Sequence, residues 1–131
     1  MRRIYLCDDA PDYRRLLREV LTAEDDLEVV GEGCNGRECL DQAPAQNPDV
    51  IVLDVNMPVM DGFEALPALL AALPGAQVLV LSTGAAPDFE ERAMELGAAA
   101  YLQKPMNVFD LPGAMRAKVA ALDRRTTPRA A

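Results

Sequence analysis

The feature that most constrains the fold is a regular alternation of short apolar runs with segments of helical period. Five runs have the length and composition of buried strands, at residues 4–7, 27–31, 49–53, 77–81 and 99–102. Each is followed by a segment with apolar residues three or four positions apart, at 12–23, 36–43, 63–73, 88–96 and 108–122. Five successive strand–helix units predict a parallel sheet covered by helices on both faces. Right-handed crossovers and a single reversal of strand order then give a doubly wound, flavodoxin-like α/β fold with five strands, in the order 2-1-3-4-5, and five helices.

The chain of 131 residues has room for one domain, which we expect over residues 1–123. Residues 124–131 are polar and lack a core pattern, so they are a free terminus or the start of a linker to an output domain. No apolar run approaches the ~20 residues of a membrane span, and no signal peptide opens the chain. We therefore expect a cytoplasmic protein without a membrane partner.

Composition excludes several classes of site. Cys7, Cys34 and Cys39 are odd in number and form no CxxC pair, which favours reduced, partly buried thiols. The chain has no histidine, so zinc sites and serine–histidine or cysteine–histidine nucleophiles lose a usual member. The net charge of -8 argues against binding of nucleic acid by this domain itself. An acidic surface suits a cation or a basic protein partner.

Two prolines conflict with the helical pattern. Pro67 and Pro112 each lie about one turn inside an expected helix, where the missing N–H and the ring clash cost roughly 3 kcal/mol. We predict that these two helices start late or have distorted first turns.

Polar residues follow four of the five expected strands. In open parallel sheets the functional site lies beyond the carboxyl ends of the strands, near the reversal of strand order. The first strand is followed by two acidic residues, the third by one, the fourth by a hydroxyl residue and the fifth by a lysine; these are Asp8, Asp9, Asp54, Ser82 and Lys104. We expect these side chains to converge at one edge of the sheet.

Such a cluster of acids predicts a bound cation. Two carboxylates ~4 Å apart repel by roughly 4 kcal/mol at an effective dielectric constant of 20. One lysine cannot neutralise three acids, so the cluster stays ionised only with a further cation. Mg²⁺ prefers a few carboxylates, several waters and a phosphate oxygen, and is therefore the cofactor that we predict.

With these residues the sequence resembles the receiver domain of two-component response regulators. The resemblance covers roughly residues 2 to 123. It rests on four segments in family-like order and spacing: "LCDDAPDYRRLL", "PDVIVLDVNMPVMDG", "VLVLSTGA" and "GAAAYLQKP".

The resemblance implies a role for each site residue. Asp54 would accept a phosphoryl group from a phosphohistidine of a bacterial sensor histidine kinase or phosphotransfer protein. Asp8, Asp9, Asp54 and the backbone carbonyl of Asn56 would hold Mg²⁺. Lys104 would contact the phosphoryl oxygens, and Ser82 would move toward them after transfer, with Tyr101 as the aromatic switch residue. The family's cis peptide bond would join Lys104 to Pro105, and phosphate lifetime would depend on Asn56 and Gly84.

Three other functions compete with this interpretation. An aspartyl-phosphate phosphatase also has a nucleophilic aspartate after a strand, but usually with a second acid two positions on, where this chain has Asn56. A flavodoxin-like FMN protein needs a hydroxyl- and glycine-rich loop where this chain has "DDAPD". A receiver-like interaction domain that takes no phosphate is opposed by the complete residue set. We therefore predict a signalling switch and not an enzyme, apart from its own phosphotransfer and autodephosphorylation.

The sequence resembles receivers that control different kinds of output domain. "LEVVGEGCNGRECL" resembles receivers of helix-turn-helix transcription factors, whereas "PDVIVLDVNMPVMDGFEAL" and "KPMN" resemble those of chemotaxis methylesterases. A stand-alone domain is the third form. A homodimer formed on phosphorylation is a family expectation.

Overall fold

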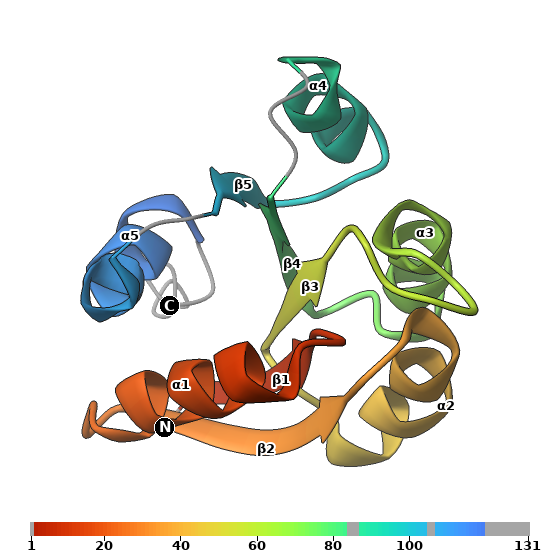
Figure 1. Cartoon of the computed structure of the whole chain (residues 1–131). Helices are drawn as coiled ribbons and strands as arrows, with labels where there is room; N and C mark the ends of the chain where they lie inside the picture. The colour runs from red at the N-terminus through yellow and green to blue at the C-terminus, as the bar shows by residue number, and fades with distance from the viewer. Residues whose placement is uncertain (1, 84–86, 105–106, 120–131) are drawn as a thin grey trace, which may run out of the picture.

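Five parallel strands form a single sheet in the computed structural model, which describes residues 2–83, 87–104 and 107–119 (Figure 1). The strands are β1 (Arg2–Cys7), β2 (Leu27–Gly33), β3 (Val50–Asp54), β4 (Gln77–Ser82) and β5 (Ala100–Gln103). Their order is β2-β1-β3-β4-β5, and every neighbouring pair is parallel. The predicted doubly wound α/β fold and its strand order are confirmed.

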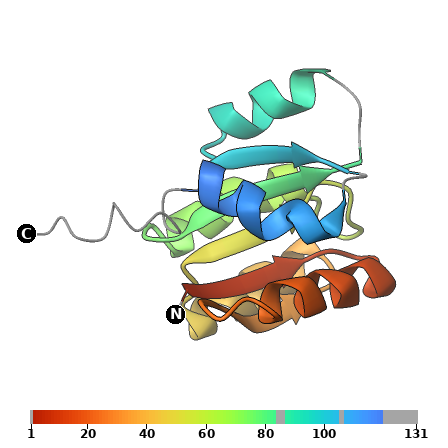
Figure 2. The same ribbon diagram turned by 90° about the vertical axis from the view of Figure 1, so that its left-hand side faces the viewer.

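Helices cover both faces of this sheet (Figures 1 and 2). They are α1 (Pro11–Thr22), α2 (Gly36–Gln46), α3 (Gly62–Ala72), α4 (Pro87–Glu95) and α5 (Leu111–Lys118), with a short 3-10 helix, η1 (Val108–Asp110), before α5. Alternate strand residues face opposite layers, as Ile4 and Leu6 pack with α1 and α5 while Tyr5 packs with α2 and α3. All five residues of β3 are buried, so the strand that ends in Asp54 is the rigid centre of the sheet.

Local sequence explains where the helices begin and end. The Asn35 side chain accepts a hydrogen bond from the Glu38 N–H and caps α2, as its position predicts. Asp61 and Glu64 form a reciprocal capping box at the start of α3. Gly97 follows α4 with φ +107, a conformation that favours glycine.

The late start predicted for the two proline-containing helices is found in one of them and not in the other. Helix α5 begins at Leu111, three residues later than expected, and Pro112 falls in its first turn, where its missing N–H costs nothing. Pro67 lies inside α3, which begins at Gly62 and runs on to Ala72. The ring of Pro67 is on the exposed side, and the helix is held by the buried face that contains Phe63, Leu66 and Leu69.

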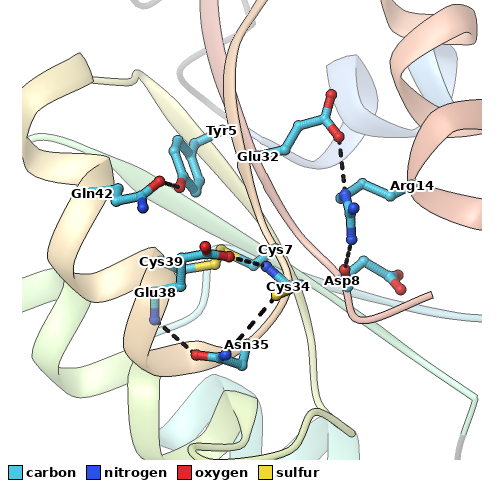
Figure 3. The surroundings of a disulfide bond; sticks show 10 residues. All are labelled: Tyr5, Cys7, Asp8, Arg14, Glu32, Cys34, Asn35, Glu38, Cys39 and Gln42. Carbon is cyan, nitrogen blue, oxygen red and sulfur yellow. Dashed lines mark hydrogen bonds and ion pairs between the residues drawn. A yellow bond between two sulfur atoms is a disulfide. The ribbon is translucent and has the colours of Figure 1, made fainter. Parts of the chain in front are cut away.

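The cysteines differ from the prediction of three reduced thiols. Cys7, at the end of β1, and Cys39, in α2, form a disulfide with a Cα–Cα distance of 6.1 Å, and both are fully buried (Figure 3). Cys34 is free and exposed. Residue spacing could not indicate this pair, because the two cysteines are 32 positions apart and meet only when α2 packs on β1.

No helix in the described ranges is both long and apolar enough to cross a membrane.

Candidate phosphoryl-acceptor and metal site

The predicted acids, Ser82 and Lys104 lie at the carboxyl-terminal edge of the sheet, at the ends of four strands. Asp54 is the last residue of β3 and Ser82 the last of β4. Asp8 and Asp9 directly follow β1, and Lys104 directly follows β5. Asp8, Asp54, Ser82 and Lys104 are all buried, with exposed fractions of 2%, 4%, 0% and 7%, while Asp9 is exposed. Buried charged groups are rare unless they are paired, so this edge is a specialised site.

Three carboxylates form the acidic part of the site. One oxygen from each of Asp8, Asp9 and Asp54 lies within 4.8 Å of the others. Only oxygen donors are present in this group, and hard divalent cations such as Mg²⁺ and Ca²⁺ prefer such donors. The exposure of Asp9 leaves an approach from solvent. The donor set therefore fits the oxygen-seeking cation that the sequence predicts.

Lys104 supplies the positive charge within the cluster. Its Nζ donates a hydrogen bond to Asp8 Oδ2 at 2.7 Å and lies 3.7 Å from Asp54 Oδ1. The backbone N–H of Lys104 donates to the Ser82 carbonyl at 2.6 Å, which fixes the ends of β4 and β5 to each other. Because its backbone is held by the sheet, the ammonium group reaches the acids from a defined direction.

Burial raises the pKa of the Asp54 carboxyl from its usual 3.8 to about 6. The Lys104 ammonium lowers this pKa and the Asp8 carboxylate raises it, with smaller contributions from the Asn56 N–H and from Asp9. Desolvation therefore outweighs the ion pair with Lys104. A further cation at the acids would favour the ionised, nucleophilic form of Asp54.

The loop after β3 holds the Asp54 backbone tightly. The Gly62 N–H donates to the Val55 carbonyl at 2.8 Å, and a Cβ on Gly62 would collide with the Asp54 carbonyl oxygen. Gly36 donates its N–H to the Met60 carbonyl at 2.9 Å and so joins the same loop to α2. Asn56 donates its backbone N–H to Asp54 Oδ1 and its side-chain amide to Thr83 Oγ1, each at 3.4 Å.

The structure brings the three predicted acids, Lys104 and Asn56 together. Oxygens of Asp8, Asp9 and Asp54 lie close to one another, Lys104 pairs with Asp8 and Asp54, and Asn56 donates its N–H to Asp54. Ser82 is fully buried at the end of β4, and half-buried Tyr101 pairs with Val80 in the sheet and packs against the α2–α3 side of the core. The peptide bond to Pro105, and Gly84, lie outside the described residues.

Two neighbours of the site were missed by the sequence reasoning. The Tyr13 ring lies under the Lys104 ammonium, with Nζ 4.3 Å from the ring centroid. Arg14 donates to the backbone carbonyl of Asp8 at 2.5 Å and pairs with Glu32 at 2.9 Å (Figure 3). Their position one turn into the helix that follows Asp8 and Asp9 was the available signal, since that turn must lie beside the site.

Comparison with known proteins identifies the family. The model of the response regulator receiver domain matches residues 4–116. The signal receiver domain of NarL from Mycobacterium tuberculosis superposes with a TM-score of 0.84 and 30% identity, covering 94% of this chain and 98% of that one. The response regulator domain of CheB from Thermotoga maritima gives a TM-score of 0.81 and 25% identity over 93% of this chain and 96% of that one.

A curated relative corrects one prediction. Protein-glutamate methylesterase/protein-glutamine glutaminase 1 of Paramagnetospirillum magneticum is 42% identical over 115 residues, which cover 85% of this chain and 30% of the relative. The first three curated relatives share this enzyme name, and the chain spans between 24% and 35% of their length. The prediction that the protein is not an enzyme is contradicted by these relatives. The predicted receiver function is confirmed: the chain belongs to the response regulator receiver domain family.

Proposed function

We propose that Asp54 is the phosphoacceptor of this receiver and takes its phosphoryl group from a phosphohistidine on a sensor histidine kinase or a phosphotransfer protein. The observation that supports this most directly is the meeting of three carboxylates and a buried ammonium at one edge of the sheet. Phosphoryl transfer mainly requires positioning and cationic stabilisation of the equatorial oxygens. Asp54 is the buried acid at the end of the central strand, so it is the best-positioned nucleophile.

The other residues of the cluster would divide the remaining tasks. Asp8, Asp9, Asp54 and the backbone carbonyl of Asn56 would hold Mg²⁺, which when bound supplies positive charge beside the phosphoryl oxygens. Lys104 Nζ, already 3.7 Å from Asp54 Oδ1, would bind an oxygen of the transferred group. One Asp54 carboxylate oxygen forms the new O–P bond while the bond from phosphorus to the donor nitrogen breaks, and the donor histidine keeps that electron pair.

Ser82 and Tyr101 would form the switch. The phosphoryl group adds strong acceptor oxygens at the end of β3, and the Ser82 hydroxyl at the end of neighbouring β4 is suited to donate to one of them. Tyr101 lies in the next strand, opposite Val80, where a change at the end of β4 can reach its ring. Such a local change would bias two arrangements of the output surface.

We further propose a cytoplasmic receiver over residues 1–123, with 124–131 as a tail or linker. The names of the curated relatives favour a methylesterase-type output over a transcription factor. Alternatively, phosphorylation would act by causing the receiver to form a homodimer.

Incubation with acetyl phosphate and Mg²⁺, followed by intact mass measurement, tests the phosphoacceptor. We expect the mass to increase by one phosphoryl group in the wild-type chain and not in Asp54→Asn. Asp41→Asn is the matched control, because Asp41 is an exposed acid of α2 that pairs only with Arg37 among the described residues. An adduct that persists in Asp54→Asn, or none in the wild-type chain, would contradict the proposal. Omission of Mg²⁺ should slow the reaction strongly.

A further inference from the structure

Tyr13 stands out because its two parts have unusual environments. The residue lies in the first turn of α1 and is half-buried. Its ring faces the Lys104 ammonium, with Nζ 4.3 Å from the centroid. Its hydroxyl is the one buried side-chain polar atom in the described part of the chain that has no hydrogen-bond partner. An unsatisfied buried hydroxyl costs stability and makes no hydrogen bond here, so a role of Tyr13 at this site has to come from its ring.

The Lys104 ammonium lies beside two carboxylates and one aromatic ring. The carboxylates are those of Asp8, at 2.7 Å, and Asp54, at 3.7 Å, and the ring is that of Tyr13. Both carboxylates belong to the acidic cluster whose oxygens suit a cation. A divalent cation on Asp8 competes with Lys104 for the same oxygens and repels the ammonium. The ring is unaffected by that competition, because its attraction for Lys104 comes from the quadrupole of the aromatic face.

The location of Tyr13 and Lys104 also suits a role in phosphoryl transfer. Tyr13 and Lys104, together with Ala10 and Thr83, line a cavity of about 320 Å³. Ala10 directly follows Asp9, and Thr83 directly follows Ser82, so this cavity adjoins the acidic cluster. Tyr13 and Lys104 therefore border the space next to the acids.

We propose that Tyr13 is a positioning residue for phosphoryl transfer, whose ring holds the Lys104 ammonium beside Asp54 when the Asp8 carboxylate is taken by a divalent cation. This inference rests on the proposed function of Asp54. The ring, and not the hydroxyl, performs this role. Removal of the hydroxyl alone should therefore leave transfer intact.

Two variants separate the ring from the hydroxyl. Tyr13→Phe keeps the aromatic ring and removes the unpartnered hydroxyl. Tyr13→Leu keeps an apolar side chain but has no aromatic ring. We expect the rate of phosphorylation by acetyl phosphate at saturating Mg²⁺ to fall by about 2- to 30-fold in Tyr13→Leu, the range that corresponds to a cation–π contact. Tyr13→Phe should stay within about 2-fold of the wild-type rate, since phenylalanine presents a comparable face to a cation.

Two further readouts distinguish positioning from a general packing effect. The ring current of Tyr13 should shift the NMR resonances of the Lys104 ε-methylene protons upfield in the wild-type chain and in Tyr13→Phe, and not in Tyr13→Leu. In a Lys104→Met background, the Tyr13→Leu substitution should cause no additional loss of rate, because its effect acts through the lysine.

Wild-type rates in Tyr13→Leu, an equal loss in Tyr13→Phe, or an additive loss in the Lys104→Met background would each overturn the positioning role. Failure of the proposed function has a different signature. In that case the wild-type chain takes no phosphoryl group at all, although the ring-current shift at Lys104 remains.

Discussion

Among the single residues, the buried carboxyl of Asp54 is the most important, because it is the proposed nucleophile. Its pKa of about 6 means that burial disfavours the charge that the nucleophile needs, even with Lys104 nearby. The folded protein therefore binds the Asp54 proton more tightly than the unfolded chain does. Between about pH 4 and pH 6, the free energy of unfolding should fall as pH rises, by about 3 kcal/mol for this group.

Asp54→Asn should consequently stabilise the protein near neutral pH. Asparagine cannot ionise, so we expect its free energy of unfolding in urea to exceed that of the wild type by up to about 3 kcal/mol at pH 7, without Mg²⁺. The difference should shrink toward zero as pH falls below the unfolded pKa of 3.8, where the wild-type carboxyl becomes protonated in both states. Addition of Mg²⁺ should stabilise the wild type and narrow the gap, because the ion binds the native state. A difference that is independent of pH would contradict this assignment.

The sequence was sufficient to place some residues of the site and not others. Asp8, Asp9, Asp54 and Lys104 could be placed in advance because the parallel topology brings the ends of the strands to one edge. The ring of Tyr13 could not, since its direction depends on how α1 packs against the end of β5. The Cys7–Cys39 disulfide depends likewise on the packing of α2 against β1.

At the scale of elements, the loop between β3 and α3 fixes the nucleophile through close backbone approach. Gly62 is the first residue of α3, and its missing side chain lets the helix start against the Asp54 carbonyl oxygen and the Val55 backbone. These neighbours are backbone atoms of a buried strand end and cannot yield as a flexible side chain does. The sequence alone did not indicate this contact.

Gly62→Ala should therefore destabilise the protein by about 1 to 3 kcal/mol and slow phosphorylation, because the added Cβ displaces the Asp54 backbone. Gly113→Ala is the matched control. Nothing lies within 4 Å of a Cβ at that position in α5, so the substitution should be neutral or stabilise by up to about 1 kcal/mol. Thermal and urea unfolding measure both changes, and equal effects of the two substitutions would show that the contact at Gly62 is unimportant.

Helix boundaries agree with the local sequence where a capping residue or a proline determines them. The caps at Asn35 and Asp61, and the late start of α5 at Pro112, agree with ordinary capping and proline rules. Pro67 in α3 does not, because the buried face of that helix overrides the local preference. Tertiary packing, which single-residue preferences do not contain, accounts for this difference.

In the whole molecule, one sheet edge brings together charged side chains from the ends of three strands, and the two faces of the sheet supply the core. The alternation of strands and helices was sufficient to predict the topology, and the topology was sufficient to predict where the site lies. The sequence of this domain left the kind of output open, and the proposal of a methylesterase-type output rests on the names of the curated relatives.

Chemical trapping of the acyl phosphate determines which aspartate of this receiver takes the phosphoryl group. The chain is treated with acetyl phosphate and Mg²⁺, the acyl phosphate is reduced with borohydride, and the digested peptides are sequenced by mass spectrometry. We predict homoserine at position 54 in the peptide that contains the end of β3, and unmodified aspartate at positions 8 and 9. Homoserine at another aspartate, or at none in a folded chain, would contradict the account.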